Sequence, residues 1–78
     1  MKAIKVLGSG CANCKITRQL IEDEARKLGV VVEIEKVEDI QEIVAFRVMA
    51  TPGVVIDGKV VHSGGVPSKE KVKSWLLA

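Results

Sequence analysis

Two cysteines separated by two residues are the most reactive feature of the chain. They form the sequence Cys11-Ala-Asn-Cys14, and the 78 residues contain no other cysteine. Residues three apart lie on the same side of a helix, so the two sulfurs can reach disulfide distance. Thiolates are nucleophiles and also ligands for soft metals. The spacing therefore favours dithiol redox chemistry, then metal binding, and last a structural disulfide, whose short loop stabilises little.

The residues around the pair place it at the start of a helix. A short β-rich run, Lys2–Leu7, ends at Gly8-Ser9-Gly10, and a helix is predicted over Ala12–Leu28. The unpaired N–H groups and partial positive charge of a helix N-terminus stabilise a thiolate, which lowers the pKa of Cys11. Cys14, one turn further in, is expected to be shielded and to resolve a mixed disulfide. The apolar positions of the helix are expected on one face: Ile16, Leu20, Ile21, Ala25 and Leu28.

The rest of the chain predicts three more strands and two more helices. Strands are expected over Val30–Val37, Gly53–Ile56 and Lys59–His62, the last two joined by the hairpin signal Asp57-Gly58. A helix opens at Asp39, which with Glu42 resembles a capping box, and the last helix starts at Pro67-Ser68. Inward-facing positions are expected in the two helices: Ile40, Ile43, Val44 and Val48, then Val72, Trp75 and Leu76.

The order of these elements predicts an α/β fold. It reads β-α-β-α-β-β-α, with a parallel strand pair from the first βαβ unit and antiparallel pairing from the hairpin. The expected product is a four-stranded mixed sheet with helices on both faces. The first and last helices are expected on one face and the middle helix on the other.

Length and composition bound the function. A chain of 78 residues is expected to be one domain, residues 1–78, and a monomer. The net charge of +2, without a clustered basic face, predicts no nucleic-acid partner. No secretory signal and no apolar run of membrane-spanning length is found, which predicts a cytoplasmic protein with no membrane partner.

The strand–CxxC–helix order, with Thr51-Pro52 before a hairpin strand, resembles the thioredoxin and glutaredoxin superfamily. The stretch from Gly8 to Lys15 and the short length are similar to the small prokaryotic thioredoxin-like "redox-active disulfide protein" group. The resemblance covers the whole chain and implies a minimal thioredoxin-like fold, a cis bond before Pro52, and catalytic Cys11 and Cys14. It also implies that an extended substrate binds at a further set of residues: Gly10, Ala12, Asn13, Thr51 and Pro52.

The resemblance further implies partners. They are a protein disulfide or dithiol substrate and an unidentified reductase. The chain departs from ordinary thioredoxin because no tryptophan precedes Cys11 and no proline precedes Cys14. It also offers no clear buried acidic residue beneath the second cysteine. These departures leave open whether the ordinary thioredoxin reductase reduces this protein. No cofactor is expected. A glycine pair, Gly64-Gly65, is similar to one that helps to hold glutathione, but the charged partners for glutathione are not evident.

Two other functions remain open at this stage. A soft-metal carrier for copper(I) places a Cys-x-x-Cys loop after its first strand, but its element order is βαββαβ and a zinc site needs four ligands. A redox sensor that docks a partner only when oxidised is the other. His62, the single histidine, is interpreted as a surface or edge residue rather than a metal ligand.

Overall fold

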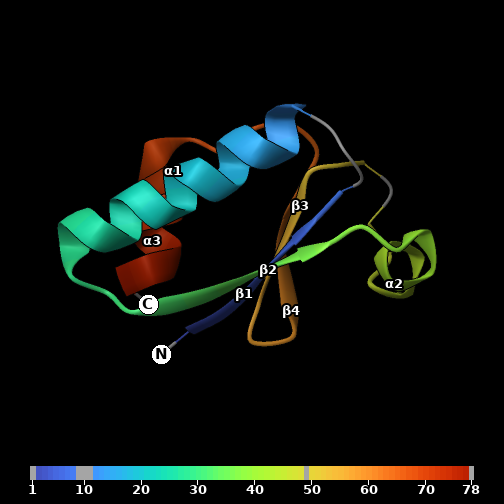
Figure 1. Ribbon diagram of the computed structural model, residues 1–78, viewed down its shortest axis with the longest axis horizontal. Helices are drawn as coiled ribbons and strands as arrows, with labels where there is room; N and C mark the ends of the chain where they lie inside the picture. Colours follow the sequence, from blue (N-terminus) through green and yellow to red (C-terminus); the bar gives the residue numbers. More distant parts are fainter. Residues whose placement is uncertain (1, 9–11, 49, 78) are drawn as a thin grey trace.

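The computed structural model describes residues 2–8, 12–48 and 50–77. Its elements are β1 (Lys2–Leu7), α1 (Ala12–Leu28), β2 (Val32–Val37), α2 (Ile40–Ala45), β3 (Gly53–Ile56), β4 (Lys59–Ser63) and α3 (Lys69–Leu77). The four strands form one sheet in the order β2-β1-β3-β4 (Figure 1). This confirms the predicted minimal thioredoxin-like α/β fold. No described helix is both long enough and apolar enough to span a membrane.

The central strand β1 sets the register of the sheet. It pairs in parallel with β2, from Lys2 opposite Val32 to Leu7 opposite Val37, and antiparallel with β3, where Leu7 lies opposite Gly53. The hairpin between β3 and β4 turns at Asp57 and Gly58, whose φ angles of 50° and 83° are both positive. Two successive residues with positive φ are typical of a type I′ turn, which matches the right-handed twist of paired strands.

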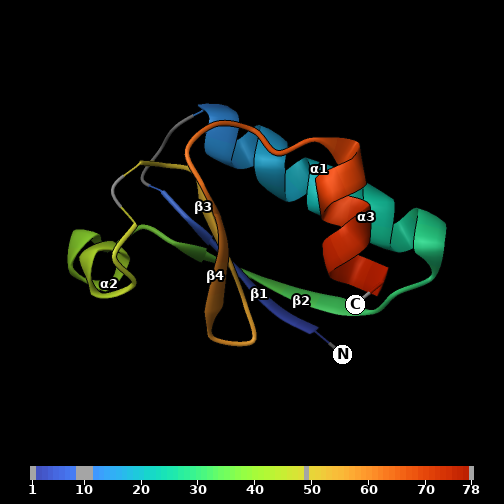
Figure 2. The ribbon, with the colours of Figure 1, turned by 180° about the vertical axis from the view of Figure 1, so that it is seen from behind.

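Two hydrophobic clusters form on opposite faces of the sheet. The cluster between the sheet and helices α1 and α3 contains Ile4, Val6, Cys14, Ile21, Ala25, Val54, Ile56, Val72 and Leu76. The cluster beneath α2 contains Leu7, Val37, Ile43, Val48 and Val55. Strand residues alternate between the two clusters because successive side chains of a strand point to opposite faces. Figures 1 and 2 show α1 beside α3, with α2 standing apart from them, as the sequence predicted.

The start of β2 differs from the prediction. The strand begins at Val32 rather than at Val30 because the chain is still closing α1. The Val30 N–H donates to the Ala25 carbonyl (2.9 Å) and the Gly29 N–H to the Arg26 carbonyl (3.3 Å). With Gly29 at a φ of 68°, these two bonds form a Schellman motif, which satisfies the last carbonyls of a helix.

The inward face of α1 was predicted wrongly in part. Ile16 is 52% exposed, although its spacing to Leu20 and Ile21 suggested a core position. The buried residues are Cys14, Thr17, Ile21, Glu24 and Ala25. Two polar side chains therefore replace apolar ones on the face that packs against the sheet and α3. Helical spacing indicates that one face of the helix is apolar. Which residues at the border of that face are buried depends on the elements that pack against it.

The inward face of α2 was also predicted too broadly. Ile43 and Val48 are buried, whereas Ile40 and Val44 are exposed. Asp39 begins the helix as predicted, because its Oδ1 accepts from the Gln41 N–H at 2.9 Å. The helix has only six residues, so a single turn contacts the sheet and the other apolar side chains face away.

Candidate active site

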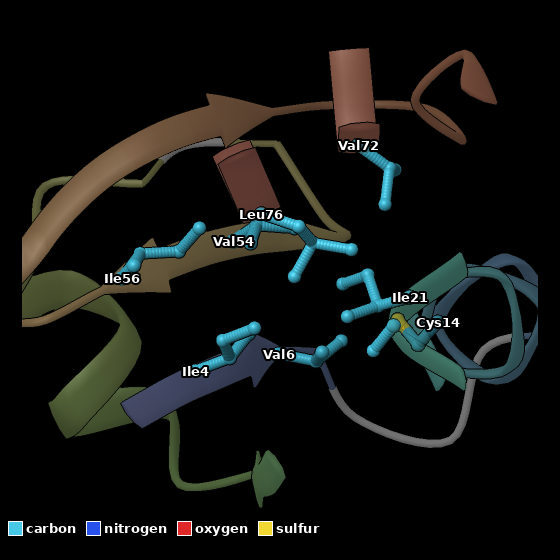
Figure 3. Packing of buried hydrophobic residues seen from close by; sticks show 9 residues of the cluster. Ile4, Val6, Cys14, Ile21, Val54, Ile56, Val72 and Leu76 are labelled. Carbon is cyan, nitrogen blue, oxygen red and sulfur yellow. The ribbon is translucent and has the colours of Figure 1, made fainter. Parts of the chain in front are cut away.

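Cys14 lies in the first turn of α1 and is disulfide-bonded. Its side chain is only 9% exposed and belongs to the cluster between α1, α3 and the sheet. Figure 3 shows it on the side of α1 that faces β1, the strand that carries Val6. Cys11 and Gly10, which the sequence also assigned to the site, lie outside the described residues, as does Ser9 of the glycine turn. The expectation that Cys14 is shielded is confirmed.

The first turn of α1 carries an additional polar contact. The Thr17 hydroxyl, fully buried, donates to the Asn13 carbonyl at 2.8 Å. Ala12 and Asn13, the two residues between the cysteines, are exposed. The helix therefore presents the middle of the motif to solvent while Cys14 points into the protein. The sequence analysis did not identify Thr17 as buried, because threonine is polar. Its spacing of three from Cys14 was the only sign that it shares the buried face of the helix.

The segment before β3 lies against the start of α1. The Thr51–Pro52 peptide bond is cis, as the resemblance implied. Pro52 is buried and Thr51 is exposed. The Gly64 N–H, which follows β4, donates to both the Ala50 carbonyl (3.1 Å) and the Pro52 carbonyl (2.9 Å). These bonds hold the segment in place at the end of the sheet where α1 begins.

Gly8 joins these two parts of the site. It follows β1 directly, and its N–H donates to the Val37 carbonyl at 2.9 Å. A methyl group at Gly8 would overlap the Cys14 Sγ and would lie 3.5 Å from the Thr51 Cβ. Gly8, Cys14 and Thr51 are thus brought together from three segments that are separate in the sequence. The sequence analysis had interpreted Gly8 only as the residue that ends a strand.

The only buried acidic residue in the described part of the chain is Glu24. It lies on α1, ten residues after Cys14, which is about 15 Å along a helix axis. Its Oε2 pairs with the Lys27 ammonium at 3.3 Å, and its Oε1 has no hydrogen-bond partner among the described residues. Glu24 is therefore too far along the helix to lie beneath Cys14.

His62 lies on the edge strand β4, as predicted. Its Nε2 is 2.9 Å from the Gly65 carbonyl oxygen, its Nδ1 is 3.2 Å from the Lys71 ammonium, and its ring lies 5.9 Å from that of Trp75. A carbonyl accepts only from N–H, so Nε2 carries the proton and Nδ1 accepts from Lys71. These contacts bind His62 to the β4–α3 side of the molecule. Among the described residues, no group of three potential metal ligands is found.

A sheet of this topology, with a disulfide-bonded cysteine in the first turn of its first helix and a cis-proline segment beside it, defines the thioredoxin-like class of proteins. The comparison with family models agrees, because the thioredoxin domain model matches residues 2–77. The chain belongs to this thioredoxin domain family.

Two curated relatives cover nearly the whole chain. A protein named thioredoxin from Methanothermobacter thermautotrophicus is 34% identical over 76 residues, which is 97% of this chain and 99% of the relative. A second thioredoxin, from Methanocaldococcus jannaschii, is 38% identical over 76 residues, or 97% of this chain and 87% of the relative. The family and these relatives place the chain among the thiol–disulfide oxidoreductases.

Proposed function

We propose that this chain exchanges disulfides with protein substrates, with Cys11 as the nucleophile and Cys14 as the resolving thiol. The observation that carries the proposal is the disulfide-bonded state of Cys14, buried in the first turn of α1 beside the cis-proline segment. A thiol in a helix's first turn benefits from the unpaired N–H groups there. A shielded second thiol is suited to attack only a sulfur already bound within the same motif.

The reaction balances as two thiol–disulfide exchanges. The Cys11 thiolate attacks one sulfur of the substrate disulfide, and the other substrate sulfur leaves as a thiolate and takes up a proton. The Cys14 thiolate then attacks the Cys11 sulfur of the mixed disulfide, which releases the second substrate thiol. The protein dithiol becomes a disulfide and the substrate disulfide becomes a dithiol. A reductase, or dithiothreitol in the test tube, returns the protein to its dithiol state.

The substrate is proposed to bind along the exposed residues around the pair. Ala12 and Asn13 are exposed on the first turn of α1, and Thr51 is exposed next to buried Pro52. Gly10 belongs to the same proposal from its position in the motif. An extended substrate segment could hydrogen-bond to the backbone at Thr51, which lies two residues before the start of β3. We propose that the protein acts in the cytoplasm, because a cysteine pair of this spacing in a reducing compartment serves redox catalysis rather than structure. We also propose that it acts as a monomer.

The test is reduction of insulin by dithiothreitol in the presence of catalytic amounts of protein. Wild type is expected to accelerate the reaction, whereas Cys11→Ser should return the rate to the dithiothreitol background. Mixed with insulin in the absence of dithiothreitol, reduced Cys14→Ser should accumulate a mixed disulfide with the substrate, visible by mass spectrometry. This species is expected because the nucleophile remains and the resolving thiol is gone.

A matched control keeps the number of thiols constant. The double variant Cys11→Ser/Ser74→Cys moves one thiol to the exposed side of α3. It is expected to be as inactive as Cys11→Ser, because two unpaired thiols cannot form the motif. Equal rates for wild type and this variant would remove the proposed function. Tight retention of copper(I) by a wild type that exchanges no disulfides would instead favour a metal carrier.

A further inference from the structure

The backbone of Gly8 lies in direct contact with the sulfur of Cys14. A Cβ built on Gly8 would overlap the Cys14 Sγ and would lie 3.5 Å from the Cys14 Cβ. No other described glycine has such a contact with a cysteine; the Cβ positions of Gly29, Gly58 and Gly65, for example, meet nothing within 4 Å. The sulfur therefore occupies space that any side chain at residue 8 would need.

The backbone on either side of this contact is held in place. Gly8 is held by its hydrogen bond to Val37 and by the preceding residue, Leu7, which is fully buried and paired on both sides within the sheet. Cys14 is 9% exposed, lies on α1 and belongs to the buried cluster between the sheet, α1 and α3. Close-packed interiors accommodate an extra methyl group only by shifting side chains or backbone, at a cost in stability.

The clash depends on the redox state of Cys14. In the described structure the sulfur is disulfide-bonded, so its position is restrained by a second covalent bond. A free thiol can rotate about χ1 into another staggered rotamer. A methyl group at residue 8 should therefore disfavour the disulfide more than the dithiol.

We infer that Gly8 is a positioning residue for Cys14, one that sets the balance between the disulfide and dithiol states by leaving space for the sulfur. The inference rests on the proposed function, because it concerns the same cysteine pair. It assigns to Gly8 a role beyond ending β1. Gly8 acts through Cys14 and is not itself a catalytic residue.

The direct test is the redox equilibrium of Gly8→Ala in glutathione buffers. The oxidised fraction is measured by alkylating the free thiols and determining the mass of the protein by mass spectrometry. This measurement needs no protein substrate. The equilibrium constant for forming the disulfide is expected to fall threefold or more. A tenfold fall, the central expectation, corresponds to a potential about 30 mV less negative. Gly29→Ala, at the far end of α1 with nothing near its Cβ position, is the matched control and should stay within threefold of wild type.

A second measurement keeps the inference testable if oxidised Gly8→Ala does not fold. The same substitution is made in a Cys14→Ala background, where the sulfur is absent. The oxidised wild-type pair and the Cys14→Ala pair are compared by urea unfolding, and an oxidised Gly8→Ala protein that does not fold counts as loss of the whole unfolding free energy. The loss in unfolding free energy on Gly8→Ala should be less than half as large without the sulfur. An equal loss in both backgrounds would mean that the methyl group meets something other than Cys14, and would overturn the inference.

The outcomes separate this inference from the proposed function. A disulfide equilibrium in Gly8→Ala that changes less than threefold, or that shifts toward the disulfide, overturns the role of Gly8 while insulin reduction by wild type still stands. Failure of wild type to reduce insulin, with a weakened disulfide in Gly8→Ala, overturns the proposed function and supports the packing role of Gly8.

Discussion

Several side-chain contacts hold the first turn of α1, where Cys14 lies, in a fixed position. The Cys14 sulfur is buried against a glycine backbone, the Thr17 hydroxyl bonds to the Asn13 carbonyl within the same turn, and a cis-proline segment lies alongside. Each of these contacts restrains the first turn of α1. A nucleophile and its resolving partner must be held in a narrow range of positions to exchange efficiently, since the attacking sulfur needs direct access to the bond it breaks.

A buried carboxylate provides a test at the residue scale. Glu24 is 1% exposed, and its Oε2 lies 3.3 Å from the Nζ of Lys27, whose side chain is 66% exposed. Lys27→Met is expected to lower the unfolding free energy by about 1–3 kcal/mol, because the buried carboxylate loses its partner. Urea unfolding measures this loss.

The neighbouring ion pair is the control for Lys27→Met. The Arg26 guanidinium lies 3.4 Å from the Asp23 carboxylate, and the two side chains are 75% and 42% exposed, against 1% for Glu24. Arg26→Met is expected to change the unfolding free energy by less than about 0.5 kcal/mol, as is usual for exposed pairs. Equal losses in the two variants would show that the burial of Glu24 adds nothing to the strength of its pairing.

At the scale of elements, α1 carries Cys14 and contributes Ile21 and Ala25 to the same buried cluster. Its buried face contains two polar residues, and the apolar Ile16 points to solvent. The helix is closed at its C-terminal end by the Schellman motif at Gly29 and Val30, so its length is set by local signals. Its orientation is set by what it packs against, the sheet and α3.

Two isoleucines of α1 test this orientation. Ile21→Ala is expected to cost about 2–5 kcal/mol, because Ile21 is fully buried and its removal leaves a cavity. Ile16→Ala should change the unfolding free energy by less than about 0.5 kcal/mol, since Ile16 is 52% exposed and belongs to neither buried cluster. Comparable losses for both variants in denaturant titrations would mean that Ile16 is packed after all.

On the scale of the whole molecule, the sheet has a separate hydrophobic cluster on each face, and α3 contributes to the larger one. Val72 and Leu76 of α3 pack into the same cluster as Cys14, Ile4 and Val54. The last helix therefore stabilises the face of the sheet on which Cys14 lies. A chain of this length buries a modest core, so a single cluster carries a large share of its stability.

Adjacent leucines near the C-terminus test the contribution of α3. Leu76 is 3% exposed and Leu77 is 68% exposed. Leu76→Ala is expected to lower the unfolding free energy by about 2–5 kcal/mol, and Leu77→Ala by less than about 0.5 kcal/mol. Trp75, half-buried on the same helix and the single tryptophan, reports the transition by fluorescence. A Leu76→Ala protein as stable as wild type would show that the core does not depend on the docking of α3.

Local patterns in the sequence were sufficient for the elements and their order. Strands β1 and β3 and helix α1 have the predicted bounds, and the Asp57-Gly58 turn and the Asp39 cap are formed as expected. These features depend on residues only a few positions apart, so the signals that specify them are contained within short segments. The cis bond before Pro52 followed from the family resemblance and not from any such local pattern.

The sequence alone thus determined the strand–CxxC–helix order and the layering of helices on the sheet. Tertiary structure decided which side chains of each helix are buried, and it decided the contact between Gly8, Cys14 and Thr51. That contact joins the end of a strand, the first turn of a helix and a segment far along the chain. Its existence depends on how the sheet register and the helix packing place those three backbones relative to one another, which no short-range pattern encodes.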